Sequence, residues 1–150
     1  MLKNIDPLLS PELLFVLAAM GHGDEIAVVD ANFPADSVAH GTCHGRVVSL
    51  AGASMPEAVV AILSVLPLDE FVDAPVRRMA VGDATDELAE VQQEVQALID
   101  REAGRHWPMG VLERFAFYEA ARGSYAVVLT GERRYFGNVL IKKVALPPEG

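Results

Sequence analysis

Hydrophobic positions along the chain predict helices and strands that alternate. Segment 13–20 is hydrophobic on every side, which is typical of a helix buried in a core or between subunits. Ser10 and Pro11 are typical of the start of this helix, and Gly21 of its end. Residues 25–30 form a continuous β-branched run, as in a strand covered on both faces. Further strands are expected at 46–50, 76–81, 125–129 and 139–144, further helices at 54–66, 86–102 and 115–122, and loops at 32–39 and 104–110.

The order of these elements predicts an α/β fold. Strands that alternate with helices are typical of a largely parallel central sheet with helices on its faces. A chain of 150 residues is normally one domain, and at that length folding buries roughly 70% of the surface of the unfolded chain. We therefore expect residues 1–150 to form a single compact domain of this class.

The chain is unusually hydrophobic for a soluble monomer of its size, with 51% hydrophobic residues and a mean hydropathy of +0.26. No run reaches the roughly 18–20 residues that span a bilayer, because the longest candidate, 58–68, contains Ser64 and Pro67. The surplus of hydrophobic surface indicates contacts between subunits. We therefore expect a homo-oligomer that does not bind membranes.

The charge and the cysteine content narrow the class of protein further. The chain carries 12 Lys and Arg against 21 Asp and Glu, a net charge of −9, and phosphates of nucleic acids require a basic surface. Cys43 is the only cysteine, so no internal disulfide can form. The first residues lack a basic stretch followed by a long hydrophobic one. We expect a cytoplasmic protein that does not bind nucleic acid.

Two residues near the first predicted strand are candidates for proton transfer. His22 lies between Gly21 and Gly23, which leave room around an imidazole whose usual pKa of about 6.5 suits acid–base chemistry near neutrality. Asp30 ends the strand 25–30, and ligands of α/β sheets gather beyond the carboxyl ends of strands. The alternatives are an ordinary loop histidine and a turn-forming aspartate.

Aromatic residues with polar neighbours form a second group of candidates, in segment 113–119. Arg114 and Tyr118 have polar tips that need partners, and a polyol site uses such groups together with aromatic faces. The alternative is a helix that packs Phe115 and Phe117 into the core, and this is the expectation for those two residues.

Asn138 offers both hydrogen-bond donors and an acceptor just before the last strand, although a hairpin turn explains residues 134–138 equally well. Asp69, after the turn at 66–68, would ordinarily lie on the surface. The sequence contains no GxGxxG, Walker, CxxC, HExxH or GxSxG motif. Taken together, the candidates suit proton transfer on a small hydroxylated molecule, with no cofactor and no metal.

In order along the chain, these segments resemble the fucose mutarotase and ribose pyranase family. The matching segments are 9–14, 20–26, 30–34, 66–69, 113–119, 130–132 and 137–143. They extend from one end of the chain to the other, while residues 80–110 match poorly. The runs Gly-His-Gly-Asp-Glu and Arg-Phe-Ala-Phe-Tyr-Glu are similar to the fucose branch rather than the ribose branch.

The resemblance implies a ribose-pyranase-like fold and an isomerase that interconverts the α and β anomers of a free sugar, here L-fucose, without a cofactor. One group protonates the ring oxygen while another takes the proton of the anomeric hydroxyl. The resemblance implies two sets of site residues: catalytic His22, Asp69 and Tyr118, and substrate-binding Asp30, Arg114, Phe136 and Asn138. The alternatives are a D-ribose pyranase and a non-catalytic sugar-binding accessory protein.

Two further expectations concern the arrangement of the site. Family members have tyrosine directly before the Gly-Asn pair, where this chain has Phe136. If that segment is a strand, Tyr135 faces the opposite side of the sheet and cannot simply substitute for the missing tyrosine. If 24–30 is one extended strand of about 20 Å, His22 and Asp30 of one chain cannot both contact one monosaccharide. Either the chain bends sharply after Gly23, or the site is shared between subunits. The resemblance favours interfacial sites, because the family often forms decameric rings.

Overall fold

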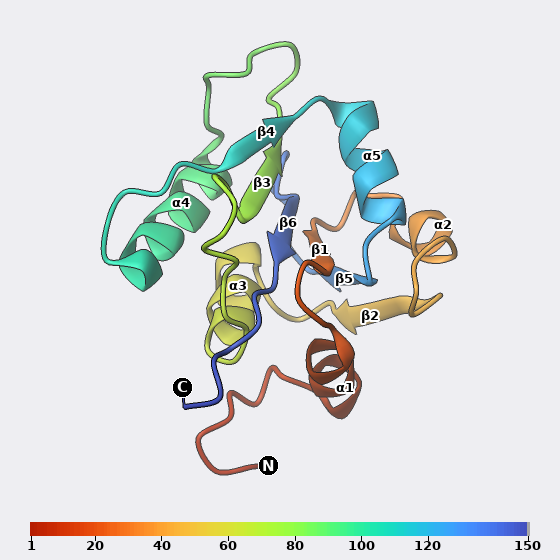
Figure 1. Cartoon of the computed structure of the whole chain (residues 1–150). Helices are drawn as coiled ribbons and strands as arrows, with labels where there is room; N and C mark the ends of the chain where they lie inside the picture. The colour runs from red at the N-terminus through yellow and green to blue at the C-terminus, as the bar shows by residue number, and fades with distance from the viewer. Residues whose placement is uncertain (150) are drawn as a thin grey trace.

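The computed structural model describes residues 1–149, in which six strands form one sheet and alternate with five helices (Figure 1). The strands are β1 (Glu25–Val29), β2 (Val47–Leu50), β3 (Val76–Met79), β4 (Gly110–Leu112), β5 (Ala126–Thr130) and β6 (Val139–Lys142), and the helices are α1 (Pro11–Ala19), α2 (Ala35–Ala39), α3 (Met55–Leu63), α4 (Glu90–Ala103) and α5 (Arg114–Arg122). The predicted α/β class is confirmed.

The sheet has the strand order β2-β5-β1-β6-β3-β4 and is largely parallel, as predicted. Strand β5 runs parallel to both β1 and β2, and β3 runs parallel to β4. Strand β6 runs antiparallel to both of its neighbours, β1 and β3. Because of this reversal, the start of β6 lies beside the carboxyl ends of β1 and β3.

Helices cover both faces of the sheet, which explains the continuous hydrophobic run of β1. Ile26 and Val28 pack into a core with residues of α1, α3 and α4, while Ala27 and Val29 pack into a second core with α2 and α5. Figure 1 shows these two groups of helices on opposite sides of the sheet. Each fully buried side chain of valine or isoleucine size contributes about 1.5–3 kcal/mol of transfer free energy.

Local signals set the starts of two helices as predicted. The Ser10 hydroxyl accepts a hydrogen bond from the backbone N–H of Leu13 at 3.2 Å. Ser54 and Glu57 form a reciprocal capping box at the start of α3. Each cap satisfies backbone donors that have no partner within the helix.

The structure corrects two expected loops. Segment 32–39 contains α2, because Pro34 precedes the helix instead of interrupting it, and Val38 and Ala39 bury its inner side. Strand β4 follows directly on the predicted loop 104–110 and includes its last residue. With three residues, β4 is too short for a hydrophobic period to reveal it, and its pairing with β3 defines it.

Helix α1 is hydrophobic on every side, but only part of it is buried within this chain. Leu13, Val16 and Leu17 face the core, whereas the side chain of Phe15 is 63% exposed. None of the helices within residues 1–149 combines the length and the hydrophobicity needed to cross a membrane.

Candidate functional site

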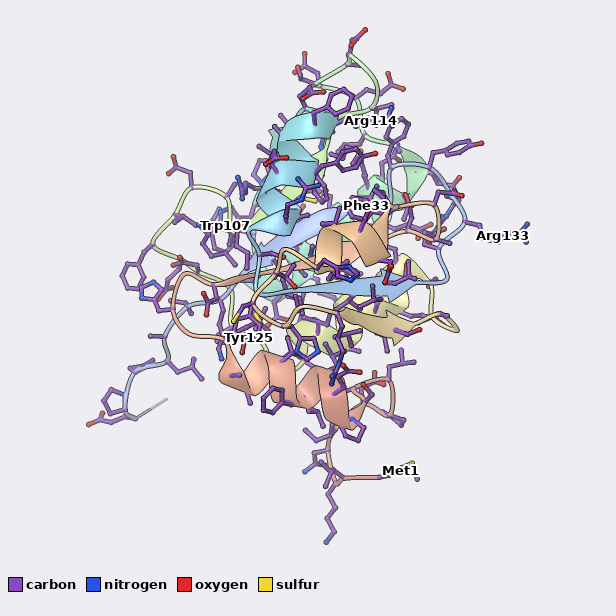
Figure 2. The ribbon with its side chains drawn as sticks, turned by 90° about the vertical axis from the view of Figure 1, so that its right-hand side faces the viewer. Met1, Phe33, Trp107, Arg114, Tyr125 and Arg133 are labelled. Carbon is purple, nitrogen blue, oxygen red and sulfur yellow. The ribbon has the colours of Figure 1, made fainter. Side chains whose placement is uncertain are left out.

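A cavity of about 340 Å³ lies where β1 and β3 end and β6 begins. Its lining residues are Asp30, Asn32, Phe33, Met79, Arg114, Tyr118, Tyr135, Phe136 and Asn138. In Figure 2, Phe33 and Arg114 mark two parts of this wall, near α2 and at the start of α5. The structure therefore brings five of the seven predicted site residues to one place, across more than 100 positions of sequence.

Asp30 and Asn138 form the buried part of the cavity and are held against each other. The Asp30 carboxylate accepts hydrogen bonds from the backbone N–H groups of Asn32 (3.0 Å) and Gly137 (3.2 Å), and from Asn138 Nδ2 (3.1 Å). In return, Asn138 Oδ1 accepts the backbone N–H of Asp30 at 3.0 Å. Both residues are less than 5% exposed.

Burial and hydrogen bonding have opposing effects on the pKa of Asp30. Burial raises its pKa above the ordinary aspartate value, and the hydrogen bonds from Asn32, Gly137 and Asn138 partly oppose this by stabilising the carboxylate. A buried carboxylate with a raised pKa is a better proton acceptor than a solvated one. The arrangement therefore suits a base that contacts a hydroxyl group in the cavity.

Arg114 and Tyr118 form the polar wall of the cavity on the first turns of α5. They are four residues apart and so lie on the same side of the helix, where Arg114 Nε donates a hydrogen bond to the Tyr118 hydroxyl at 2.9 Å. The ring of Phe33 packs edge-on against Tyr118, with centroids 5.3 Å apart. These contacts fix the direction of two polar groups that can bind sugar hydroxyls.

The two phenylalanines of this helix have different environments. Phe117 is fully buried, as predicted, whereas the expectation that Phe115 packs in the core is wrong, because its side chain is 65% exposed. Residues two apart on a helix point about 200° away from each other, so one face of α5 cannot bury both. The exposed ring of Phe115 instead contacts the Arg114 guanidinium and Tyr118.

The segment before β6 is not a strand, which changes the relation between Tyr135 and Phe136. Strand β6 begins at Val139, and Phe136 has a φ of +64°, in the left-handed region. Its backbone carbonyl accepts a hydrogen bond from Gln92 Nε2 at 3.0 Å. Side chains therefore do not alternate here, and both aromatic residues line the cavity.

The two remaining predicted residues, His22 and Asp69, lie together at the other end of β1. His22 Nε2 is 3.6 Å from Asp69 Oδ1, and the His22 ring is 5.9 Å from the ring of Phe71. The Asp69 side chain is 3% exposed, so it is not the ordinary surface carboxylate expected from its place in the sequence. The His22 side chain is 49% exposed and accessible to a ligand.

The length of β1 separates these two groups. At about 3.3 Å per residue, the five residues of β1 alone span about 16 Å between these two groups, more than the length of one monosaccharide. Within residues 1–149, no group of three or more His, Cys, Asp or Glu side chains could hold a metal ion. The chain thus presents two separate sets of acid–base residues.

Comparison with known proteins identifies the family of this chain. The family described as "RbsD / FucU transport protein family" matches residues 3–145. The chain belongs to this family. The resemblance identified from the sequence motifs is thereby confirmed.

Relatives within the RbsD/FucU family cover the whole chain. The fucose mutarotase of Danio rerio is 42% identical over 149 residues, which span 99% of this chain and 96% of the relative. A crystal structure of the protein Atu2016, described as sugar-binding, has a TM-score of 0.95 at 50% identity and covers 98% of this chain and 97% of its own. The fucose mutarotase of Streptococcus pneumoniae, solved in complex with L-fucose, has a TM-score of 0.86 at 34% identity, with 97% and 100% covered.

The cavity wall includes residues that were not predicted as site residues from the sequence, among them Phe33, Met79 and Tyr135. Phe33 lies in a segment that carried the family resemblance, so its position beside Asp30 was a usable signal. Met79 gave no signal, because its place in the wall depends on the pairing of β3 with β6. Tyr135 was set aside on the assumption of a strand that the structure does not contain.

Proposed function

We propose that this chain is an L-fucose mutarotase, an isomerase that interconverts the α and β anomers of the free sugar without a cofactor. The observation that carries the proposal is the buried carboxylate of Asp30, held by Asn138 beside the polar wall of Arg114 and Tyr118. The names of the relatives, fucose mutarotases at about 40% identity over the whole chain, support the choice of L-fucose.

The proposed reaction needs one proton donor and one proton acceptor. The acceptor takes the proton of the anomeric hydroxyl while the donor protonates the ring oxygen; the bond between C1 and the ring oxygen breaks, and the aldehyde forms. Rotation about the adjacent C–C bond and the reverse proton transfers close the ring on the other face. We assign His22 as the donor, oriented by Asp69, and Asp30 as the acceptor.

The other residues of the cavity bind the sugar in this proposal. Tyr118, which the family resemblance marks as catalytic, and Arg114 contact hydroxyls next to the reacting carbon, and their mutual hydrogen bond keeps both groups oriented. Asn138 binds a hydroxyl and holds the Asp30 carboxylate, and Phe136 stacks on a hydrophobic face of the sugar.

We further propose that a complete site combines two subunits of a homo-oligomer, with His22 and Asp69 from one and the Asp30 cavity from its neighbour. The length of β1, about 16 Å between the two groups, supports this arrangement. A hydrophobic cavity of about 490 Å³ beside His22, lined largely by α1 and the segment after β6, supplies surface for such a contact. A cytoplasmic, decameric ring of single mutarotase-like domains, each of residues 1–150, is the assembly that the family resemblance favours.

Exchange spectroscopy by NMR on L-fucose, D-ribose and D-galactose tests the activity directly. The native chain should accelerate exchange between the anomers of L-fucose, and His22→Ala should lower the acceleration by about 100-fold or more, the usual contribution of a general acid. Faster exchange between pyranose and furanose forms of ribose would instead assign a pyranase. Binding of a sugar without any exchange would assign an accessory protein.

A mixing experiment tests the shared site. His22→Ala and Asp30→Asn are each expected to be inactive, but they damage different halves of the site. If both are dissociated, mixed and reassembled, hetero-oligomers contain interfaces with two intact halves and activity returns. Each variant taken alone through the same cycle is the control, and a mixture that stays inactive would show that one chain supplies the whole site.

A further inference from the structure

Tyr135 lies at the mouth of the cavity and has no role in the reaction proposed above. It lines the same wall as Phe136, and its side chain is 75% exposed, so its hydroxyl is available to a ligand. The left-handed backbone of Phe136 is the reason that two successive side chains reach one cavity. Such a conformation is costly for a residue other than glycine and persists only where the surroundings impose it.

The surroundings of Tyr135 hold its backbone from both sides. On one side, the guanidinium of Arg134 donates hydrogen bonds to Glu132 at 3.0 Å and to both carboxylate oxygens of Glu94 on α4, at 2.7 and 3.1 Å. On the other side, the buried Gln92, also on α4, donates to the carbonyl of Phe136 at 3.0 Å. The backbone of Tyr135 is therefore fixed while its side chain stays accessible.

Besides Tyr135, the polar residues that line the cavity are Asp30, Asn32, Arg114, Tyr118 and Asn138. Asp30 and Asn138 occupy the buried end, and Arg114 and Tyr118 occupy the wall formed by α5. Phe136 offers only a hydrophobic face, whereas a monosaccharide carries hydroxyls around its whole ring. Tyr135, the residue next to Phe136, lines the same cavity, and its phenol hydroxyl can both donate and accept a hydrogen bond.

We infer that Tyr135 is a substrate-binding residue whose hydroxyl contacts a sugar hydroxyl at the mouth of the cavity, next to the hydrophobic face of Phe136. The inference rests on the proposed function and assigns the hydroxyl contact to a residue that the family pattern does not mark. It also makes the pair Tyr135 and Phe136 a determinant of which monosaccharide the cavity prefers.

The test compares Tyr135→Phe with Tyr125→Phe, a matched control that removes a phenol hydroxyl outside the lining of the cavity. Loss of a single neutral hydrogen bond should raise the KM for L-fucose by about 3- to 10-fold and leave kcat nearly unchanged, because the contact is made equally in the ground state and the transition state. The control should keep the native KM. Adding Phe136→Tyr to the Tyr135→Phe variant should restore a low KM, because it returns a hydroxyl to the same wall.

The outcomes separate this inference from the proposed function. A native KM in Tyr135→Phe, or an equal rise in Tyr125→Phe, would overturn the role of Tyr135 while leaving the mutarotase intact. If the native chain catalysed no exchange, the proposed function would fail. The same variants would then be compared by their Kd for L-fucose in saturation-transfer NMR, and an unchanged Kd in Tyr135→Phe would overturn the inference.

Discussion

Replacing Glu132 with glutamine should destabilise the fold strongly at neutral pH, although this residue lies outside the cavity. Its side chain is 5% exposed and accepts hydrogen bonds from the backbone N–H groups of Met55 (3.2 Å) and Arg134 (3.0 Å) and from the Arg134 guanidinium (3.0 Å). These contacts, the guanidinium first, lower the pKa of Glu132 from 4.5 to about 2. At about 1.4 kcal/mol per pKa unit, the folded state gains about 3 kcal/mol from the ionised form.

The sign of this effect sets a clear dependence on pH. Because the pKa is lower in the folded state, the stabilisation is complete above about pH 4.5 and is lost as the pH falls towards 2. Urea denaturation followed by circular dichroism, at matched protein concentration, should show Glu132→Gln to be less stable than the native chain by about 3 kcal/mol at pH 7. The difference should shrink to about 1.4 kcal/mol at pH 3.

A second variant on the same arginine controls for the loss of any carboxylate. Glu94 also pairs with Arg134, but its side chain is 43% exposed, so Glu94→Gln should cost no more than about 0.5 kcal/mol. A loss in Glu132→Gln that is independent of pH, or an equal loss in Glu94→Gln, would refute the reasoning. The first result would mean that packing, not the charge of Glu132, accounts for its contribution.

Two further predictions concern the base and the packing of loops. Asn138→Ala removes a hydrogen bond that lowers the pKa of Asp30, so the carboxylate should protonate more easily. The acid limb of the pH profile for anomer exchange should therefore move to higher pH. If the limb does not move, Asp30 is not the titrating base. Gly131→Ala should lower the thermal midpoint by several degrees, because its Cβ would overlap the backbone carbonyl oxygen of Ala51. Gly52→Ala is the control and should change the midpoint little, because no atom lies within 4 Å of the position of its Cβ.

Local patterns in the sequence were sufficient to predict most of the elements. The caps at Ser10 and Ser54 depend on residues three positions away, and the β-branched run of β1 needs only to be buried on both faces to be stable. Helix α2 and strand β4 were missed because each is short and is defined by its tertiary contacts. Elements of three to five residues carry too few positions for a hydrophobic period to be seen.

The sequence by itself determined the α/β class, the place of Asp30 at the end of a buried strand, and the motifs that identified the family. Only the tertiary structure decided which of those residues meet. Asp30 and Asn138 are 108 residues apart and come together because β6 runs antiparallel beside β1, while His22 is held at the opposite end of the same strand. The direction of the Phe136 backbone, fixed by a contact from α4, likewise decided that Tyr135 faces the cavity. Hydrogen bonds between distant segments form only once the sheet is assembled, so no local pattern could encode these outcomes.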